Sequence, residues 1–231
     1  MAVAHDTATR SSTTFDNNSV SFSHAGAAGT RGVAVLIAQE AGATDQISGV
    51  TYGGVTVPRV RREVRSTAEA GQVYAYFLGT GVPTGTQTCA ITTNPTSGAD
   101  DWAGVCCTVT AAADTTVNAQ AGTTSAAAAN PSLAISPTAA AVIYYVIWTG
   151  LAAPVTTVEA GGTHLFGNDF GADSAMWSRK AVAAGATSMG YTAASDVFAH
   201  IALAIAEVAA TVLPQRPLLM INSAVARAAT R

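Results

Sequence analysis

The side chains best suited to ligand chemistry lie in residues 161–173 and just beyond them. Asn168, Asp169 and Asp173 offer oxygen ligands at spacings that a calcium-binding loop could use. Trp177 follows closely, and an aromatic face beside polar turns is also what a sugar site requires. The spacing matches no defined calcium motif, however, and Asn, Asp and Gly are ordinary turn residues. Two interpretations stand: a glycan contact through Trp177, Asn168 and Asp169, or a turn-rich loop without a ligand.

A second candidate surface is the arginine-rich stretch of residues 59–65. In a strand, alternate side chains point to opposite faces, so Arg59, Arg61 and Arg65 would share one face. This row could dock an acidic neighbour or bind an anion. The alternative, which the pattern favours, is the solvated face of an outer strand, where arginine discourages pairing with other chains. We treat these three arginines as candidate partner-binding residues.

The sequence contains no recognisable catalytic motif. It has no Gly-x-Ser-x-Gly elbow, no His-Glu-x-x-His pair and no phosphate-binding Gly-Lys-Ser/Thr loop. Its four histidines are scattered, and none has metal-ligand spacing to another His or Cys. Asp100 and Asp101 could supply one of the two carboxylates that glycoside hydrolysis needs, but an acidic turn explains them as well. We expect no enzyme, no catalytic residues, and no cofactor or metal.

Composition narrows the choice of partners. Only 11% of the 231 residues are charged, against about 25% in an average globular domain. A surface so poor in charge favours association with other protein chains. The net charge of −3 gives no reason to expect nucleic acid. The longest apolar runs, such as residues 142–148, are too short for a membrane span, and the first residues do not resemble a signal peptide, so we expect cytoplasmic synthesis without membrane insertion.

Strand-forming patterns dominate the chain. Residues 33–38 are apolar on both faces, which is typical of a central strand. Residues 47–57 contain two β-branched runs around Gly53 and Gly54, which predicts a hairpin. About a dozen such strands predict an all-β protein, a two-sheet antiparallel β-sandwich of jelly-roll type. For residues 197–206 a helix is an open alternative, because alanine is frequent there.

The three cysteines do not form a disulfide framework. Cys106 and Cys107 are adjacent, and neighbouring side chains in a strand point to opposite faces. We expect both to be small buried hydrophobic residues.

We expect the sandwich to occupy residues 1–212 and a C-terminal tail to occupy residues 213–231. Two prolines end the last strand, and the apolar residues Leu218, Leu219 and Ile221 follow them, with a short helix as an option. An apolar segment beyond a completed sandwich has little core left to enter. We therefore expect these three side chains to anchor the tail on another chain.

The order of the segments carries a family resemblance. An apolar strand precedes the hairpin at residues 47–55, an aromatic strand at residues 73–78 leads to a Val-Pro-Thr-Gly-Thr turn at residues 82–86, and a small-residue strand ends at residues 114–117. This layout resembles a group of jelly-roll-like virion proteins of tailed bacteriophages. The closing Leu-Pro-Gln-Arg-Pro at residues 213–217 is similar to the ends of such proteins from phages of actinobacteria.

The resemblance implies a non-enzymatic minor tail protein, or another virion structural protein, located in the phage tail rather than the capsid. It implies other virion proteins as partners and a homo-oligomer, with a trimer common among tail-end proteins of this kind. The main alternative is a module that binds host cell-wall glycan through Trp177, Tyr191 or residues 161–173. A capsid decoration protein and a glycan hydrolase are further alternatives.

Overall fold

The computed structural model describes residues 3–12, 19–40, 44–66, 70–94, 101–153 and 157–208. Within these residues the chain forms sixteen strands and no helix. The N-terminal half contains β1 (Ala4–Arg10), β2 (Val20–Gly26), β3 (Thr30–Glu40), β4 (Ile47–Tyr52), β5 (Val55–Thr56), β6 (Arg59–Ser66), β7 (Ala70–Leu78), β8 (Gly85–Thr93) and β9 (Trp102–Thr110). The C-terminal half contains β10 (Thr115–Ala128), β11 (Ser132–Ile135), β12 (Ala141–Thr149), β13 (Thr163–Asp169), β14 (Ser174–Val182), β15 (Thr187–Gly190) and β16 (Asp196–Glu207).

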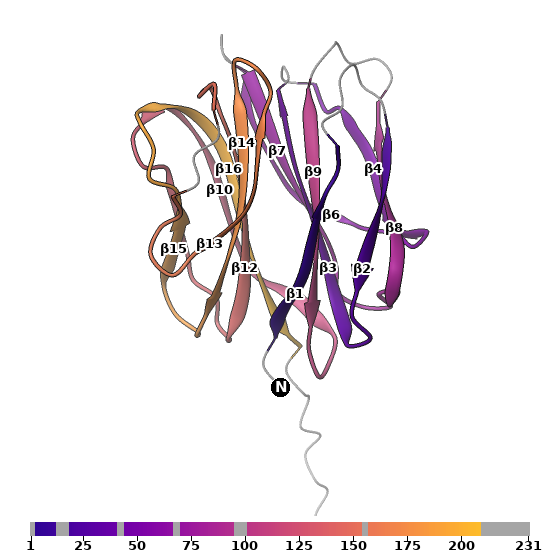
Figure 1. The fold of residues 1–231 in the computed structure, drawn as a ribbon. Coiled ribbons are helices and arrows are strands. Elements are labelled where there is room, and N and C mark those ends of the chain that lie inside the picture. Colours follow the sequence, from indigo (N-terminus) through magenta and orange to yellow (C-terminus); the bar gives the residue numbers. More distant parts are fainter. Residues whose placement is uncertain are drawn as a thin grey trace, which may run out of the picture.

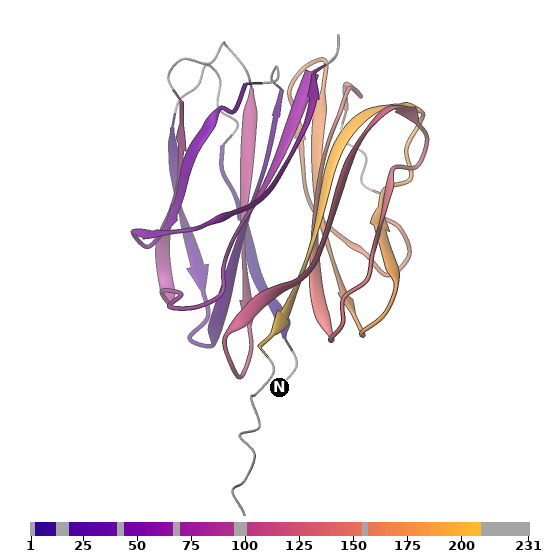
Figure 2. The same cartoon turned by 180° about the vertical axis from the view of Figure 1, so that it is seen from behind.

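The strands form four antiparallel sheets that are stacked as layers (Figures 1 and 2). The inner N sheet has the order β1-β9-β3-β7-β6, and the inner C sheet has the order β10-β16-β12-β14-β13. The outer N sheet, β2-β8-β4-β5, covers one of them, and the outer C sheet, β11-β15, covers the other. In Figure 1 the N-terminal half lies on the right and the C-terminal half on the left, with the inner sheets between the outer ones.

Three hydrophobic cores separate these layers. The middle core lies between the inner sheets and combines side chains of both halves, such as Leu36 with Trp148 and Trp177. A second core lies between the two N sheets, and a third lies between the two C sheets. Each inner sheet is therefore buried on both faces, which explains why β3, β9, β12 and β16 have few polar side chains.

The two halves repeat one strand order. In the inner N sheet, β1 pairs with β9, β9 with β3, and β3 with β7. In the inner C sheet, the corresponding pairs are β10 with β16, β16 with β12, and β12 with β14. In the outer sheets, the pair of β2 with β8 corresponds to the pair of β11 with β15. In the described part of the C-terminal half, a single bridge between Val158 and Tyr191 occupies the place that β4 takes in the N-terminal half. The outer C sheet is thus a reduced version of the outer N sheet.

The predicted all-β fold and antiparallel sandwich are confirmed. The chain has four sheets where two were predicted, because strands that are apolar on both faces need a covering layer on each side. The alternative helix at residues 197–206 is strand β16, which lies inside the inner C sheet. The domain boundary at residue 212 stays a prediction. The tail, residues 213–231, lies outside the described residues.

Two local predictions are also confirmed. Gly53 and Gly54 have φ values of 55° and 79°, and a type I′ hairpin loop needs positive φ at both positions. The strands on either side of this turn, β4 and β5, pair as expected. Cys106 and Cys107 are both buried and contribute to different cores, as adjacent residues of one strand should.

Candidate functional site

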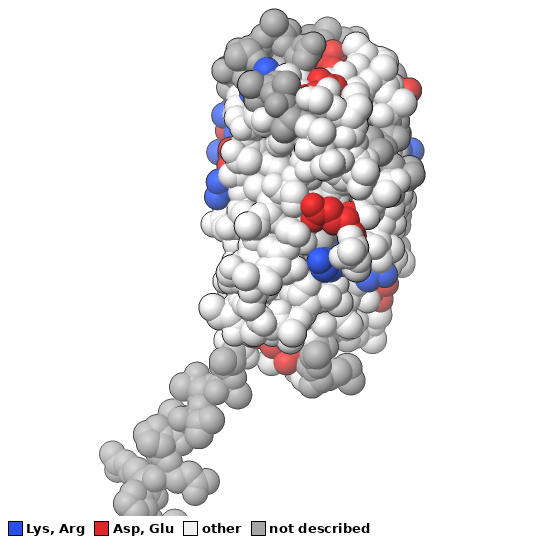
Figure 3. Space-filling model, turned by 90° about the vertical axis from the view of Figure 1, so that its left-hand side faces the viewer, with Lys and Arg blue, Asp and Glu red and all other residues white. Residues whose placement is uncertain are grey.

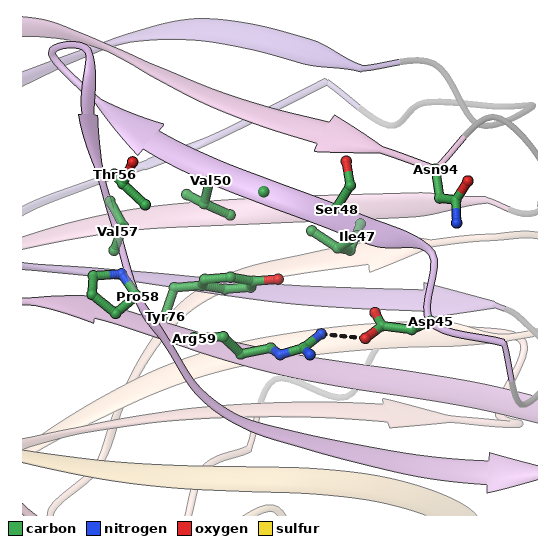
Figure 4. A pocket seen from close by; sticks show the side chains of 11 residues that line it. Asp45, Ile47, Ser48, Val50, Thr56, Val57, Pro58, Arg59, Tyr76 and Asn94 are labelled. Carbon is green, nitrogen blue, oxygen red and sulfur yellow. Dashed lines mark hydrogen bonds and ion pairs between the residues drawn. The ribbon is translucent and has the colours of Figure 1, made fainter.

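An open pocket of about 440 Å³ lies where the chain crosses from the outer N sheet to the inner N sheet (Figure 4). The amide of Val57 still donates to the carbonyl of Val50 in β4, at 2.9 Å. The carbonyl of the next residue, Pro58, already accepts from the amide of Phe77 in β7, at 2.9 Å. The chain changes sheets between Val57 and Pro58, and proline suits this crossing because it donates no ladder hydrogen bond. The pocket occupies the space between the diverging β4 and β6.

The pocket has an apolar floor and a polar rim. Ile47, Val50, Val57 and Tyr76 line it from below, and each is at most 3% exposed. Burial raises the pKa of the Tyr76 phenol, so this ring is neutral. The polar lining comes from strand ends and connections: Asp45, Ser48, Thr56, Arg59 and Asn94.

An ion pair spans one side of the pocket. Arg59 Nη1 donates to Asp45 Oδ2, and the two side chains are 41% and 37% exposed. The hydrogen bond to Asp45 raises the pKa of the Arg59 guanidinium, which keeps this arginine charged. The second carboxylate oxygen, Asp45 Oδ1, has no hydrogen-bond partner among the described residues. In Figure 4 this oxygen points away from Arg59, toward the β4 side of the pocket.

Sequence reasoning identified only Arg59 of this site. Asp45, Tyr76 and Asn94 belong to three separate segments that meet only through sheet pairing. One signal was present in the sequence: the Val-Pro-Arg order at residues 57–59 ends an apolar strand with proline and resumes as a charged one. Such a break predicts a change of sheet, although not the residues that the change brings together.

The three candidate arginines do not share one face, which corrects the prediction. A β-bulge interrupts the register between Arg59 and Arg61: Arg59 pairs with Tyr76, whereas Arg61 pairs with Ala75. One extra residue reverses the alternation of side chains. Arg59 therefore faces the pocket, while Arg61 lies on the side of the C-terminal half.

Arginines join the two halves at both edges of the inner sheets. At one edge, Arg61 Nη2 donates to the carbonyl of Gly122 at 3.0 Å, and Arg65 Nη1 donates to the carbonyl of Ser125 at 2.6 Å. Both acceptors belong to β10. At the other edge, Arg10 of β1 donates to the carbonyl of Gly167 and, at 3.0 Å, to Asn168 Oδ1 in β13. A contact of Arg59, Arg61 or Arg65 with a partner chain stays a prediction.

Residues 161–173 are not a loop throughout, because they include strand β13. Asn168 is 4% exposed and is engaged by Arg10. Asp169 is exposed, and its Oδ1 accepts from the amide of Gly171 at 2.7 Å in the following turn. Both side chains thus have partners within the fold, and a glycan contact through Asn168 or Asp169 stays a prediction. In the described parts of the chain, no three His, Cys, Asp or Glu side chains lie close enough together to hold a metal ion.

The aromatic residues proposed for glycan binding are in the core. Trp177 is fully buried between the inner sheets, and its indole donates to the carbonyl of Leu36 at 3.1 Å. Tyr191 is fully buried between the C sheets, with its ring centroid 5.8 Å from that of Tyr145. Neither ring can offer a face to a sugar, so glycan contact by Trp177 or Tyr191 is wrong for this fold.

A hydrogen-bonded group of polar side chains beside β1 contains the residue types of a catalytic triad but not its geometry. Thr108 Oγ1 donates to Asp6 Oδ2 at 3.0 Å and lies 3.2 Å from His24 Nε2, while Thr9 Oγ1 lies 2.9 Å from His24 Nδ1. In a nucleophile triad the carboxylate bonds directly to the imidazole. Here Thr108 stands between the two groups. Burial lowers the pKa of His24, so its imidazole is neutral near pH 7.

The candidate anchor residues Leu218, Leu219 and Ile221 lie outside the described residues. The described part of the chain has no helix long and apolar enough to cross a membrane. Comparison of the chain with protein-family models, curated proteins and solved structures gave no match.

Proposed function

We propose that the protein is a non-enzymatic structural component of a tailed-phage virion, specifically a minor tail protein at the tail tip, that acts by assembling with other virion proteins. The order of segments in the sequence motivates the family, and the arrangement of the side chains supports a scaffold. A homo-oligomer, with a trimer as the first expectation, is part of the proposal.

One observation carries the scaffold role. All three tryptophans, all six tyrosines and all three cysteines of the chain are buried. These are the side chains that binding proteins place at hot spots and that many enzymes use for chemistry. Here they fill three cores between four sheets. Because these tryptophan, tyrosine and cysteine side chains are packed inside the fold, we infer that they stabilise a rigid scaffold.

The strand order supports a jelly roll in each half. In the N-terminal half, β1-β9-β3-β7 and β2-β8-β4-β5 form two facing four-stranded sets with the alternating connections of that fold. The C-terminal half keeps the inner set and part of the outer set. We infer two tandem jelly-roll units that share the middle core. In a double-sheet jelly roll each sheet buries one face against the other, and capsid and lectin domains use this fold repeatedly.

The surface fits contacts that depend on shape more than on charge. Figure 3 shows the side of the C-terminal half, where most of the surface is uncharged. Among the described residues, Val55 and Val208 are the only large apolar side chains with substantial exposure. Stable association therefore needs a further apolar contribution, and we assign it to Leu218, Leu219 and Ile221 of the tail.

Two measurements test this function. Particles purified from the phage that encodes the chain should contain it in several copies, as determined by quantitative mass spectrometry and antibody labelling in electron micrographs. Its absence from purified particles would contradict the virion role. Separately, a chain ending at residue 212 should keep the circular dichroism and melting behaviour of the full chain yet fail to assemble. Normal incorporation of the truncated chain would show that the tail is no anchor.

A further inference from the structure

We propose that the pocket between β4 and β6 binds a neutral sugar unit of a glycan, with Asp45 and Arg59 as its polar recognition pair. This inference is independent of the virion role, because it concerns only the chemistry of the pocket. It also replaces the glycan contact expected at Trp177 with a different site.

The charges of the pocket favour a neutral ligand. Arg59 and Asp45 carry opposite charges and already pair with each other. An anionic ligand that approached Arg59 would meet the carboxylate of Asp45, and a cationic ligand at Asp45 would meet the guanidinium. A sugar avoids both penalties, because each hydroxyl can donate to a carboxylate and accept from a guanidinium. Two neighbouring hydroxyls can therefore bridge the pair without breaking it.

The pair has unused hydrogen-bonding capacity. Asp45 Oδ1 has no hydrogen-bond partner in the described part of the chain and lies on the β4 side of the pocket (Figure 4). This oxygen is shielded from solvent, so a sugar hydroxyl would reach Asp45 through the exposed 37% of its side chain, beside Arg59. Arg59 presents further N–H groups, since a guanidinium has five. The exposed hydroxyls of Ser48 and Thr56 lie on the same rim.

The apolar part of the pocket suits the other side of a sugar ring. Pro58 is exposed at the pocket and offers an aliphatic surface on which the C–H face of a pyranose can pack, whereas Val50 and Val57 form the buried floor beneath it. A volume of about 440 Å³ falls within the usual range for small-ligand sites. The pocket is open, and its rim residues Ser48, Thr56 and Pro58 are exposed, so neighbouring sugar units can extend into solvent. This geometry accepts a unit of a longer glycan as well as a free monosaccharide.

Among the described residues, the elements that form this pocket occur in the N-terminal half alone. The pocket depends on β4 and on the crossing from β5 to β6. In the described residues of the C-terminal half, the corresponding place holds only the Val158–Tyr191 bridge. The strand order that the two halves share thus concerns mainly the inner sheets. The pocket depends on the outer N sheet, which has more strands than the outer C sheet. One binding site per chain is expected.

Titration of the full chain with neutral sugars tests the proposal. We would record NMR or calorimetric titrations with glucose, galactose, mannose, arabinose and N-acetylglucosamine, and with neutral oligosaccharides of each. At least one should bind one-to-one with a millimolar or lower Kd. Asp45→Asn should weaken that binding at least tenfold. Gly49→Phe should also weaken it, because Gly49 lines the pocket and a Cβ there meets no other atom within 4 Å, which leaves room for a bulky ring beside the ligand.

Matched variants separate recognition from stability. Glu63→Gln removes a carboxylate from the other arginine pair, Arg61–Glu63, on the opposite face of β6. Thr88→Phe adds the same aromatic ring to an exposed position of the outer N sheet outside the pocket. Both should leave the Kd within twofold, provided that melting curves show folded protein. If Asp45→Asn fails to fold, Gly49→Phe alone decides.

Three outcomes would overturn the proposal. The first is that no neutral sugar binds at concentrations up to about 50 mM, well above the millimolar range of weak binding. The second is that acetate, phosphate or a short peptide binds at Asp45 and Arg59 in place of sugar. The third is a sugar Kd that Asp45→Asn and Gly49→Phe leave unchanged. None of these results bears on the virion role, which the composition of purified particles tests separately.

Discussion

The indole nitrogen of Trp177 donates a hydrogen bond to the main-chain carbonyl of Leu36, across the core between the two inner sheets and at 3.1 Å. The two residues are separated by 141 positions in the sequence and belong to different halves. Dispersion and the hydrophobic effect hold sheets together without fixing their relative position. A directional hydrogen bond inside such a core fixes the position of one sheet relative to the other, because a shifted arrangement would leave a buried donor unpaired.

Replacement of this side chain should destabilise the whole chain. Trp177→Phe removes the hydrogen bond and leaves a void in the middle core. We expect the free energy of unfolding to fall by about 2–3 kcal/mol, measured by urea denaturation. Trp148→Phe is the matched control, because Trp148 lies in the same core and its indole nitrogen has no hydrogen-bond partner among the described residues. The loss of unfolding free energy for Trp148→Phe should be smaller by about 1 kcal/mol. Equal losses for the two variants would show that the Trp177–Leu36 hydrogen bond does not contribute to stability.

Gly71 provides a test of packing at the same interface. A Cβ at this position would lie 1.9 Å from Cδ2 of Trp148, so the middle core has no room for a methyl group. Gly71→Ala should lower the free energy of unfolding by about 2–3 kcal/mol. Gly49→Ala is the control, because a Cβ there meets no atom within 4 Å, and its effect should stay within about 0.5 kcal/mol. Similar melting temperatures for the two variants would contradict this packing.

The edge arginines should stabilise the contact between the halves. Arg65→Ala removes a donor to the carbonyl of Ser125, and Arg10→Ala removes donors to Gly167 and Asn168 at the opposite edge. Each change should cost about 1–2 kcal/mol in urea denaturation. Arg31→Ala is the control, because the guanidinium of Arg31 donates to the neighbouring carbonyl of Thr30. If Arg10→Ala and Arg65→Ala unfold at the same urea concentration as Arg31→Ala, these bonds do not hold the halves together.

Local structure was largely predictable because it depends on neighbouring residues. The Gly53-Gly54 turn, the central strand at residues 33–38 and the opposite faces of Cys106 and Cys107 follow from backbone sterics and alternation alone. The number of layers was predicted wrongly, as two sheets where the structure has four. Several strands are apolar on both faces, which indicates that a layer covers each face but does not give the number of sheets that share these strands.

The candidate site was not predictable in the same way. The bulge between Arg59 and Arg61 inserts one residue without changing the residue types, so simple alternation placed both arginines on one face. Trp177 follows a polar turn in the sequence, yet the turn leads into β14, whose face packs on the other half. Which face is covered depends on pairing between distant strands, and such pairing is set by the global fold.

His200 gives the fold a defined acid sensitivity. It is fully buried, and its Nδ1 lies 2.6 Å from the hydroxyl of Tyr145. Burial lowers the pKa of His200 to about 3, whereas an unfolded histidine has a pKa of about 6.5. The unfolded chain therefore binds more protons between these values, and stability falls as the pH decreases below about 6.5.

The expected loss can be measured in a window where carboxylates titrate little. From pH 7.5 to pH 5, His200 alone should lower the free energy of unfolding by about 2 kcal/mol. His200→Gln keeps a hydrogen-bonding group beside Tyr145 and removes the titration, so its stability should depend less on pH by that amount. His5, whose pKa burial lowers to about 4, titrates in both proteins and cancels in the comparison. Parallel pH profiles for the wild-type chain and His200→Gln would assign the acid sensitivity to other groups.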